Sequence, residues 1–196
     1  MRILAVSDIE EKGLRDLWTP ERTKGVDLII SCGDLRPDYL GFLAAVTNAD
    51  LFYVHGNHDG EYGSFDEAGG TCMEDRIVRF GGLRIMGLGG SMRYKPGNNL
   101  YSEREMLFRA ARLSAAAACA RGIDILVTHA PPRGFGDLED LPHRGFETFN
   151  RILNLFRPAL MLHGHIHPCY GRIRKERTHP AGTEIINVCG YRVIDL

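Results

Sequence analysis

The chain has 196 residues, of which 44% are hydrophobic, and its 24 Lys and Arg against 25 Asp and Glu leave a formal net charge of -1. This length fits a single domain spanning residues 1–196, with enough apolar residues for a substantial core. The near-neutral charge argues against a broad electropositive surface, and therefore against nucleic acid as a partner. No apolar run approaches the ~18 residues that cross a membrane. Five cysteines without a CxxC pair predict reduced thiols and a cytoplasmic location.

The first part of the chain alternates apolar runs with helical patterns. Residues 3–6 are apolar throughout, which predicts a central strand covered on both faces rather than a signal peptide. Residues 11–23 are expected to form two short helical pieces, because Pro20 interrupts them. Strands are expected at 26–31 and 51–54, with a helix beginning at Pro37 between them. This order is typical of right-handed βαβ units.

The middle of the chain changes character. Residues 61–74 form a glycine-rich connection, and residues 76–80 and 83–88 are two strands joined by Gly81-Gly82, which predicts a hairpin. Residues 89–99 are expected to be a loop. Ser102 and Glu105 have the spacing of a capping box, so a helix should begin there and end at Gly122.

The remaining residues return to strands and complete the predicted fold. A strand is expected at 123–127 and a helix at 145–157, stopped by Pro158. Further strands are expected at 159–162, 170–175, 183–188 and 191–194. We therefore predict an α/β fold in which two mixed β-sheets are flanked by helices, giving a four-layer α-β-β-α sandwich.

Polar side chains follow five of the predicted buried strands. They are Asp8, Glu10, Asp34, Asn57, His58, His129, His165 and His167. Carboxylate, carboxamide and imidazole ligands without a thiolate suit Mn²⁺, Fe, Zn²⁺, Co²⁺ or Mg²⁺. Because these groups exceed what one tetrahedral ion needs, the sequence predicts two divalent metal ions sharing a bridging carboxylate.

These motifs, in this order, resemble those of the calcineurin-like metallophosphoesterases. The resemblance rests on Asp8, Gly33-Asp34, Gly56-Asn57-His58-Asp59, Thr128-His129 and Gly164-His165-Ile166-His167. It implies the metallo-dependent phosphatase fold. It also implies that Asp8 and His167 bind the first metal, that Asp34 bridges both metals, and that the second metal is bound by Asn57, His129 and His165. His58 would act on the leaving group, and Asp59 would orient it through a hydrogen bond.

The first motif departs from the family pattern. The family has Asp-x-His there, whereas this chain has Asp8-Ile9-Glu10. Either Glu10 is itself a metal ligand, which would favour harder ions, or it only hydrogen-bonds a metal-bound water and the first site is weak. His55, His143, His163 and His179 lie outside the motifs and are interpreted as structural residues. The basic segment 172–177 is interpreted as the solvated face of a hairpin strand.

The resemblance implies a phosphoesterase that hydrolyses phosphodiester or phosphomonoester bonds with a hydroxide activated by two metals. A small phosphorylated substrate is favoured, because the compact chain leaves no separate domain to cap a large substrate. One alternative is a nuclease of the same superfamily, against which the near-neutral charge argues. The other is a non-catalytic scaffold, but such a protein would be expected to lack His58 or several ligands. The sequence does not indicate an oligomeric state.

Overall fold

The computed structural model describes residues 1–171 and 174–196. The strands of the described chain are β1 (Arg2–Ser7), β2 (Leu28–Ser31), β3 (Asp50–Tyr53), β4 (Thr71–Cys72), β5 (Arg76–Phe80), β6 (Leu83–Leu88), β7 (Ser91–Met92), β8 (Leu100–Tyr101), β9 (Ile125–Thr128), β10 (Leu160–His163), β11 (Glu176–Thr178), β12 (Glu184–Asn187) and β13 (Gly190–Asp195). The α-helices are α1 (Pro37–Thr47), α2 (Glu103–Cys119) and α3 (Glu147–Phe156). Short 3-10 helices occupy Pro20–Thr23, Asp59–Glu61, Phe65–Ala68, Leu141–His143 and Pro168–Tyr170.

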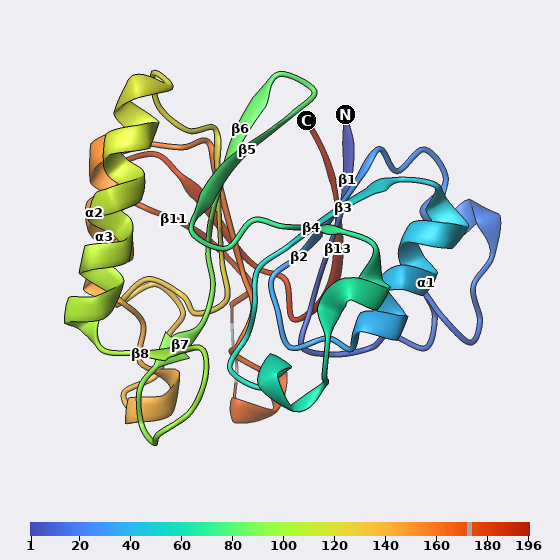
Figure 1. Ribbon diagram of the computed structural model, residues 1–196, viewed down its shortest axis with the longest axis horizontal. Helices are drawn as coiled ribbons and strands as arrows, with labels where there is room; N and C mark the ends of the chain where they lie inside the picture. The colour runs from blue at the N-terminus through green and yellow to red at the C-terminus, as the bar shows by residue number, and fades with distance from the viewer. Residues whose placement is uncertain (172–173) are drawn as a thin grey trace.

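Two mixed sheets pack face to face between layers of helices (Figure 1). The first sheet has the order β13-β1-β2-β3-β4, in which β13 is antiparallel to β1 and the other pairs are parallel. The second has the order β11-β12-β10-β9-β6-β5, with antiparallel pairs at both ends. Helix α1 covers one outer face, and α2 and α3 cover the other. The predicted four-layer α-β-β-α sandwich is confirmed.

The burial of strand β1 on both faces explains why its sequence is apolar throughout. Successive side chains of a strand point to opposite faces. Ile3 and Ala5 join the core between the two sheets, whereas Leu4 and Val6 join the core beneath α1. All four side chains are fully buried. A strand covered on both faces therefore needs no polar alternation.

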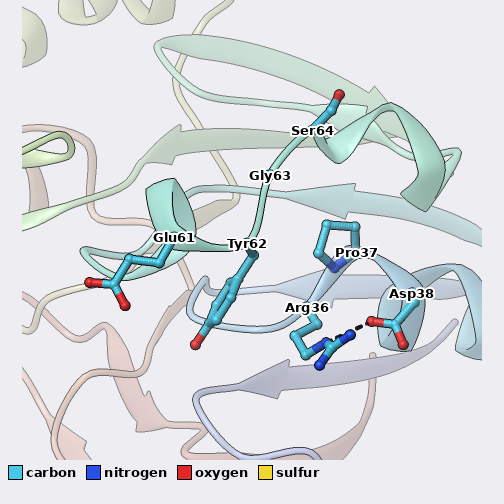
Figure 2. Close-up of a pocket in the computed structure, with 7 residues that line it drawn as sticks. All are labelled: Arg36, Pro37, Asp38, Glu61, Tyr62, Gly63 and Ser64. Atoms are coloured by element: carbon cyan, nitrogen blue, oxygen red, sulfur yellow. Dashed lines mark hydrogen bonds and ion pairs between the residues drawn. The ribbon is translucent and has the colours of Figure 1, made fainter.

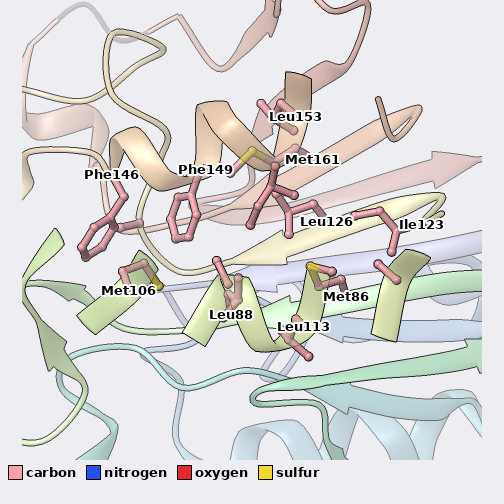
Figure 3. Close-up of a cluster of buried hydrophobic side chains, with 14 of the residues drawn as sticks. Met86, Leu88, Met106, Leu113, Ile123, Leu126, Phe146, Phe149, Leu153 and Met161 are labelled. Carbon is pink, nitrogen blue, oxygen red and sulfur yellow. The ribbon is translucent and has the colours of Figure 1, made fainter. Parts of the chain in front are cut away.

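A third core lies between the second sheet and its two helices (Figure 3). Phe149 and Leu153 of α3 converge there with Met106 of α2 and with strand residues such as Leu126. The cores fix both sheets, and with them the carboxyl ends of the central strands.

Several local predictions are confirmed. The capping box is present, since the Ser102 hydroxyl accepts from the Glu105 N–H at 3.3 Å and the Glu105 carboxylate accepts from the Ser102 N–H at 2.7 Å. Helix α1 begins at Pro37, and the hairpin β5–β6 pairs Phe80 with Leu83 across its glycines. No helix of the described residues is long and apolar enough to cross a membrane.

Other local predictions are wrong. Residues 11–23 contain turns and one 3-10 helix, Pro20–Thr23, instead of two helical pieces. The strand expected at 170–175 is displaced: Pro168–Tyr170 is a 3-10 helix, residues 172–173 lie outside the described chain, and β11 starts at Glu176. The strands β4, β7 and β8 were not predicted, because two residues are too short to show a period.

Candidate metal centre

The predicted ligands follow strands that end at one edge of the sandwich. Strands β1, β2 and β3 are mutually parallel, and so are β9 and β10. Because parallel strands present their carboxyl ends at the same edge, the residues that follow them meet there. These residues are Asp8, Asp34, Asn57, His129, His165 and His167.

The first group of donors contains residues that follow strands of both sheets. One ligand atom each of Asp8, Asp34 and His129 lies within 4.8 Å of the others. His129 Nε2 is 3.2 Å from Asp34 Oδ2 and 3.1 Å from Asn57 Oδ1. Two carboxylates, an imidazole and a carboxamide oxygen are a donor set that fits a divalent cation.

A second group of donors lies beside the first. It contains Asp8, His167 and Cys189, again with ligand atoms within 4.8 Å of one another. His167 Nε2 is 3.4 Å from Asp8 Oδ1. Asp8 belongs to both groups, so the bridging role that the resemblance gives to Asp34 stays a prediction. Cys189 was not among the predicted ligands, because its thiol was interpreted only as a reduced cysteine. The available signal was its place directly after the predicted strand 183–188.

The hydrogen bonds of two imidazoles determine which ring nitrogen is left to bind a metal ion. His129 Nδ1 lies 2.8 Å from the carbonyl of Cys32, and His165 Nε2 lies 2.9 Å from that of Pro142. A carbonyl only accepts, so each of these nitrogens donates its proton. Nε2 of His129 and Nδ1 of His165 therefore remain to bind a metal ion. In metal-bound histidines one ring nitrogen binds the metal while the other donates its proton to a protein acceptor. The two rings lie 4.9 Å apart, centroid to centroid.

Glycines allow the ligand turns to approach one another. A Cβ on Gly56 would collide with the Asp34 carboxylate, and a Cβ on Gly164 would collide with Ser7 and with the Asp8 carboxylate. Gly56 and Gly164 are thus required by the close contact between the turns.

Three of the predicted ligands have left-handed backbone conformations. The φ angles are 64° at Asp8, 57° at Asp34 and 68° at His165. Such conformations cost free energy in residues other than glycine, and they gather at functional sites. Here they turn the backbone so that the Asp8 carboxylate accepts from the backbone N–H of His165 at 2.9 Å.

The electrostatics of the cluster favour a cation. Burial alone would raise the pKa of Asp34, yet the neighbouring His129 outweighs it and brings the pKa down to about 2. Burial alone would lower the pKa of His129, but the Asp34 carboxylate raises it to about 10. Buried, ionised carboxylates need a compensating positive charge, and a bound cation would provide it in place of the proton.

His58 and Asp59 follow the Asn57 ligand directly. The backbone N–H of His58 donates to Asp34 Oδ1 at 2.7 Å, while its imidazole is 46% exposed and lies 3.6 Å from Glu61. Asp59 is buried and accepts from the N–H of Gly56 at 2.8 Å through Oδ2. Its Oδ1 is without a hydrogen-bond partner among the described residues. Asp59 therefore holds the turn before His58, and its hydrogen bond to the His58 imidazole stays a prediction.

Glu10 lies apart from both donor groups of the described chain. Its carboxylate pairs with Arg15 at 3.2 Å, and Arg15 also pairs with Asp38 at 2.9 Å. Direct binding of a metal ion by Glu10 stays a prediction, because the Glu10 carboxylate already has Arg15 as its ionic partner.

The histidines outside the motifs have protein partners of their own. His163 is buried and donates from Nδ1 to the carbonyl of Gly164 at 2.9 Å, and burial lowers its pKa to about 4. His55 lies 3.7 Å from Glu74, and His143 lies 2.6 Å from Asp140. His179 accepts from the N–H of Ala181 at 3.1 Å.

An open pocket of about 540 Å³ lies among residues that follow Asp34 and His58 in the chain (Figure 2). It is lined by Arg36, Pro37, Asp38, Glu61, Tyr62, Gly63 and Ser64. Arg36 is two residues from the predicted ligand Asp34, and Glu61 lies 3.6 Å from the His58 imidazole. The described lining contains none of the predicted ligands, and within it Asp38 pairs with the Arg36 guanidinium at 3.0 Å.

Comparisons with known proteins show which chains this one is similar to. UPF0046 protein T07D4.2 of Caenorhabditis elegans is 28% identical over 148 residues, which cover 74% of this chain and 35% of that protein. The chain therefore spans about a third of that relative. An uncharacterized protein of Haemophilus influenzae is 28% identical over 172 residues, covering 71% of this chain and 72% of that one. A crystal structure that is 15% identical superposes with a TM-score of 0.71 over 99% of this chain and 94% of that chain, which shows the shared fold.

The residues that match a family profile include all five motifs. The profile of the calcineurin-like phosphoesterases matches residues 1–169, which include both histidines of the last motif. Five motifs in order, a donor cluster at one sheet edge and this match lead to the same assignment. The chain belongs to the calcineurin-like phosphoesterase family.

Proposed function

We propose that the protein is a metal-dependent phosphoesterase that hydrolyses phosphodiester or phosphomonoester bonds of a small substrate. The observation that carries the proposal is the clustering of the Asp8, Asp34 and His129 ligand atoms within 4.8 Å, with His167 against Asp8. Two divalent cations bound there would neutralise the phosphoryl oxygens and acidify the attacking water.

The chain's own residues have separate tasks in this reaction. The donors Asp8, Asp34, Asn57, His129, His165 and His167 would hold the cations. His58 is held beside them by its backbone bond to Asp34, and its imidazole is exposed to a substrate. It would donate a proton to the departing alkoxide as a general acid.

The size of the adjacent pocket supports a small substrate. Its volume of about 540 Å³ suits a small ligand. The ring of Tyr62 and the backbone of Gly63 would contact the part of the substrate that leaves. The formal net charge of -1 supports the same class, because a polyanion would require an excess of positive charge.

A substrate and metal screen tests the proposal. The purified chain would be stripped with a chelator and then supplied with Mn²⁺, Zn²⁺, Fe²⁺, Co²⁺ or Mg²⁺. Each form would be assayed on a bis-aryl phosphate, an aryl monophosphate and cyclic nucleotides. We expect hydrolysis that disappears on chelation and returns with metal. A folded, metal-loaded protein that hydrolyses none of these compounds would contradict the proposal and favour the scaffold alternative.

A further inference from the structure

We propose that Cys189 is a ligand of the first metal ion, beside Asp8 and His167, and that its thiolate gives this position a preference for Zn²⁺ or Co²⁺ over Mg²⁺. This inference rests on the proposed function, because it concerns the same metal centre. It departs from the donor set expected from the sequence, which contains only oxygen and nitrogen.

The separations of the three donors fit a common ion. Sγ of Cys189, a carboxylate oxygen of Asp8 and a ring nitrogen of His167 all lie within 4.8 Å of one another. The 3.4 Å between His167 Nε2 and Asp8 Oδ1 is what two ligands at tetrahedral angles have when each bond is about 2.0–2.1 Å long. A longer metal–sulfur bond, about 2.3 Å, allows the thiolate a wider separation from both.

The environment of Cys189 is polar although the residue is only 2% exposed. Buried cysteines usually act as small apolar side chains inside a core. Among the described residues, the three hydrophobic clusters include Cys32 but not Cys189. Its thiol faces a carboxylate and an imidazole, which is the setting of a ligand and a poor one for a packing residue.

Hydrogen bonds hold Cys189 against the last histidine motif. Its backbone N–H donates to Asn187 Oδ1 at 3.0 Å, and Nδ2 of the same Asn187 donates to the carbonyl of Ile166 at 2.8 Å. Ile166 lies directly before His167. One buried carboxamide therefore fixes the thiol relative to the imidazole, as the supporting hydrogen bonds of metal ligands do.

The carboxylate of Glu10, two residues from Asp8 in the sequence, is paired with Arg15. Asp8 and His167 supply two protein donors of the second group, and Cys189 supplies the third. On binding, the S–H bond breaks, a metal–sulfur bond forms and the proton passes to the buffer.

Cobalt spectroscopy tests this proposal directly. The metal-free chain would be titrated with Co²⁺ alone, and the absorption spectrum recorded. A thiolate ligand gives a charge-transfer band in the near ultraviolet, which oxygen and nitrogen ligands do not. We expect this band in the unaltered chain and its loss in Cys189→Ser, with the weaker visible bands of the second ion retained. Cys169→Ser and Cys119→Ser, which change two exposed thiols, should keep the band.

The outcomes separate this proposal from the function itself. Co²⁺ binding without the near-ultraviolet band, or with a band that persists in Cys189→Ser, would overturn the ligand while leaving a phosphoesterase intact. Absence of any Co²⁺ binding by a folded chain would overturn both. A measurement on the unaltered chain guards against a variant that fails to fold: the X-ray absorption fine structure of the Zn²⁺-loaded chain should contain a metal–sulfur distance of about 2.3 Å. A Zn²⁺ environment of oxygen and nitrogen alone would contradict the proposal.

Discussion

Oδ2 of Asp34 lies 3.2 Å from Nε2 of His129, although Asp34 follows a strand of the first sheet and His129 follows a strand of the second. The pair therefore closes the ligand cluster across the interface between the sheets.

Removing partners that only support a metal ligand already costs about 10–100-fold in metal affinity. We expect Asp34→Asn to lose more than that, measured by titration calorimetry with Mn²⁺. Asp50→Asn, an exposed change at the start of β3, is the control, and equal affinities for the two variants would contradict the assignment.

His58 should matter for turnover and not for metal content. A general acid typically contributes about 10²–10⁴-fold to the rate. We expect His58→Asn to lose activity in that range while retaining metals by elemental analysis. The loss should be greater for an alkyl leaving group than for a nitrophenolate, which needs no proton. The same loss with both leaving groups would mean that His58 acts through binding instead.

Glu10 should matter little for metal binding. Because its carboxylate pairs with Arg15 and belongs to neither donor group of the described chain, we expect Glu10→Gln to reduce metal affinity by less than the roughly 10–100-fold that the loss of a ligand's hydrogen-bond partner costs. Asp8→Asn, measured in the same titrations, should reduce it further. If the two variants lose affinity equally, Glu10 is a direct ligand, as one reading of the sequence holds.

Gly164 should not tolerate a side chain. A Cβ there would collide with the Ser7 hydroxyl and with the Asp8 carboxylate, both of which are held by surrounding structure. Overpacking of this kind costs about 1–3 kcal/mol, and we expect Gly164→Ala to lower the free energy of unfolding by that amount in urea and to weaken metal binding. Gly13→Ala, where the new Cβ would meet only the flexible end of Arg22, is the control. An unchanged metal affinity in Gly164→Ala would show that the contact does not position Asp8.

Glu74 should make stability depend on pH. Burial alone would raise the pKa of this carboxyl, but His55 and Arg109 outweigh it and lower the pKa in the folded state. A lowered pKa contributes stability that is present above the unfolded value of about 4.3 and is lost as the pH falls through the folded value. Glu74→Gln should therefore be less stable than the unaltered chain at pH 7, and the difference should shrink below pH ~4. Urea unfolding at several pH values measures this. A difference that stays constant with pH would contradict the assignment.

Much of the fold could be predicted because its signals are local. The capping box at Ser102, the glycines of the β5–β6 hairpin and the apolar run of β1 each determine their own element. Residues 11–23 were misjudged because Leu14, Leu17 and Trp18 have helical spacing but only Leu14 is fully buried. Tertiary packing overrides such a pattern when there is no surface for the helix to cover.

The ligand cluster was predictable for a different reason. Asp8, Asp34 and His129 each follow a buried strand, and parallel strands bring such residues to one edge. Contacts that depend on the final packing were not predictable. The place of Cys189 beside Asp8 joins two segments that lie far apart in the sequence. The pairing of Glu10 with Arg15 and the contact of Asp59 with Gly56 are local, but they depend on how each turn is oriented in the folded chain.

Two cations should bind where these motifs meet. A crystal of the chain grown with Mn²⁺, measured at a wavelength at which manganese scatters anomalously, would locate them. We expect two anomalous peaks per chain about 3.5–4 Å apart, both within bonding distance of the cluster and with Asp34 or Asp8 between them. A well-ordered structure in the presence of excess Mn²⁺ with no peak near Asp34 and His129 would contradict this expectation.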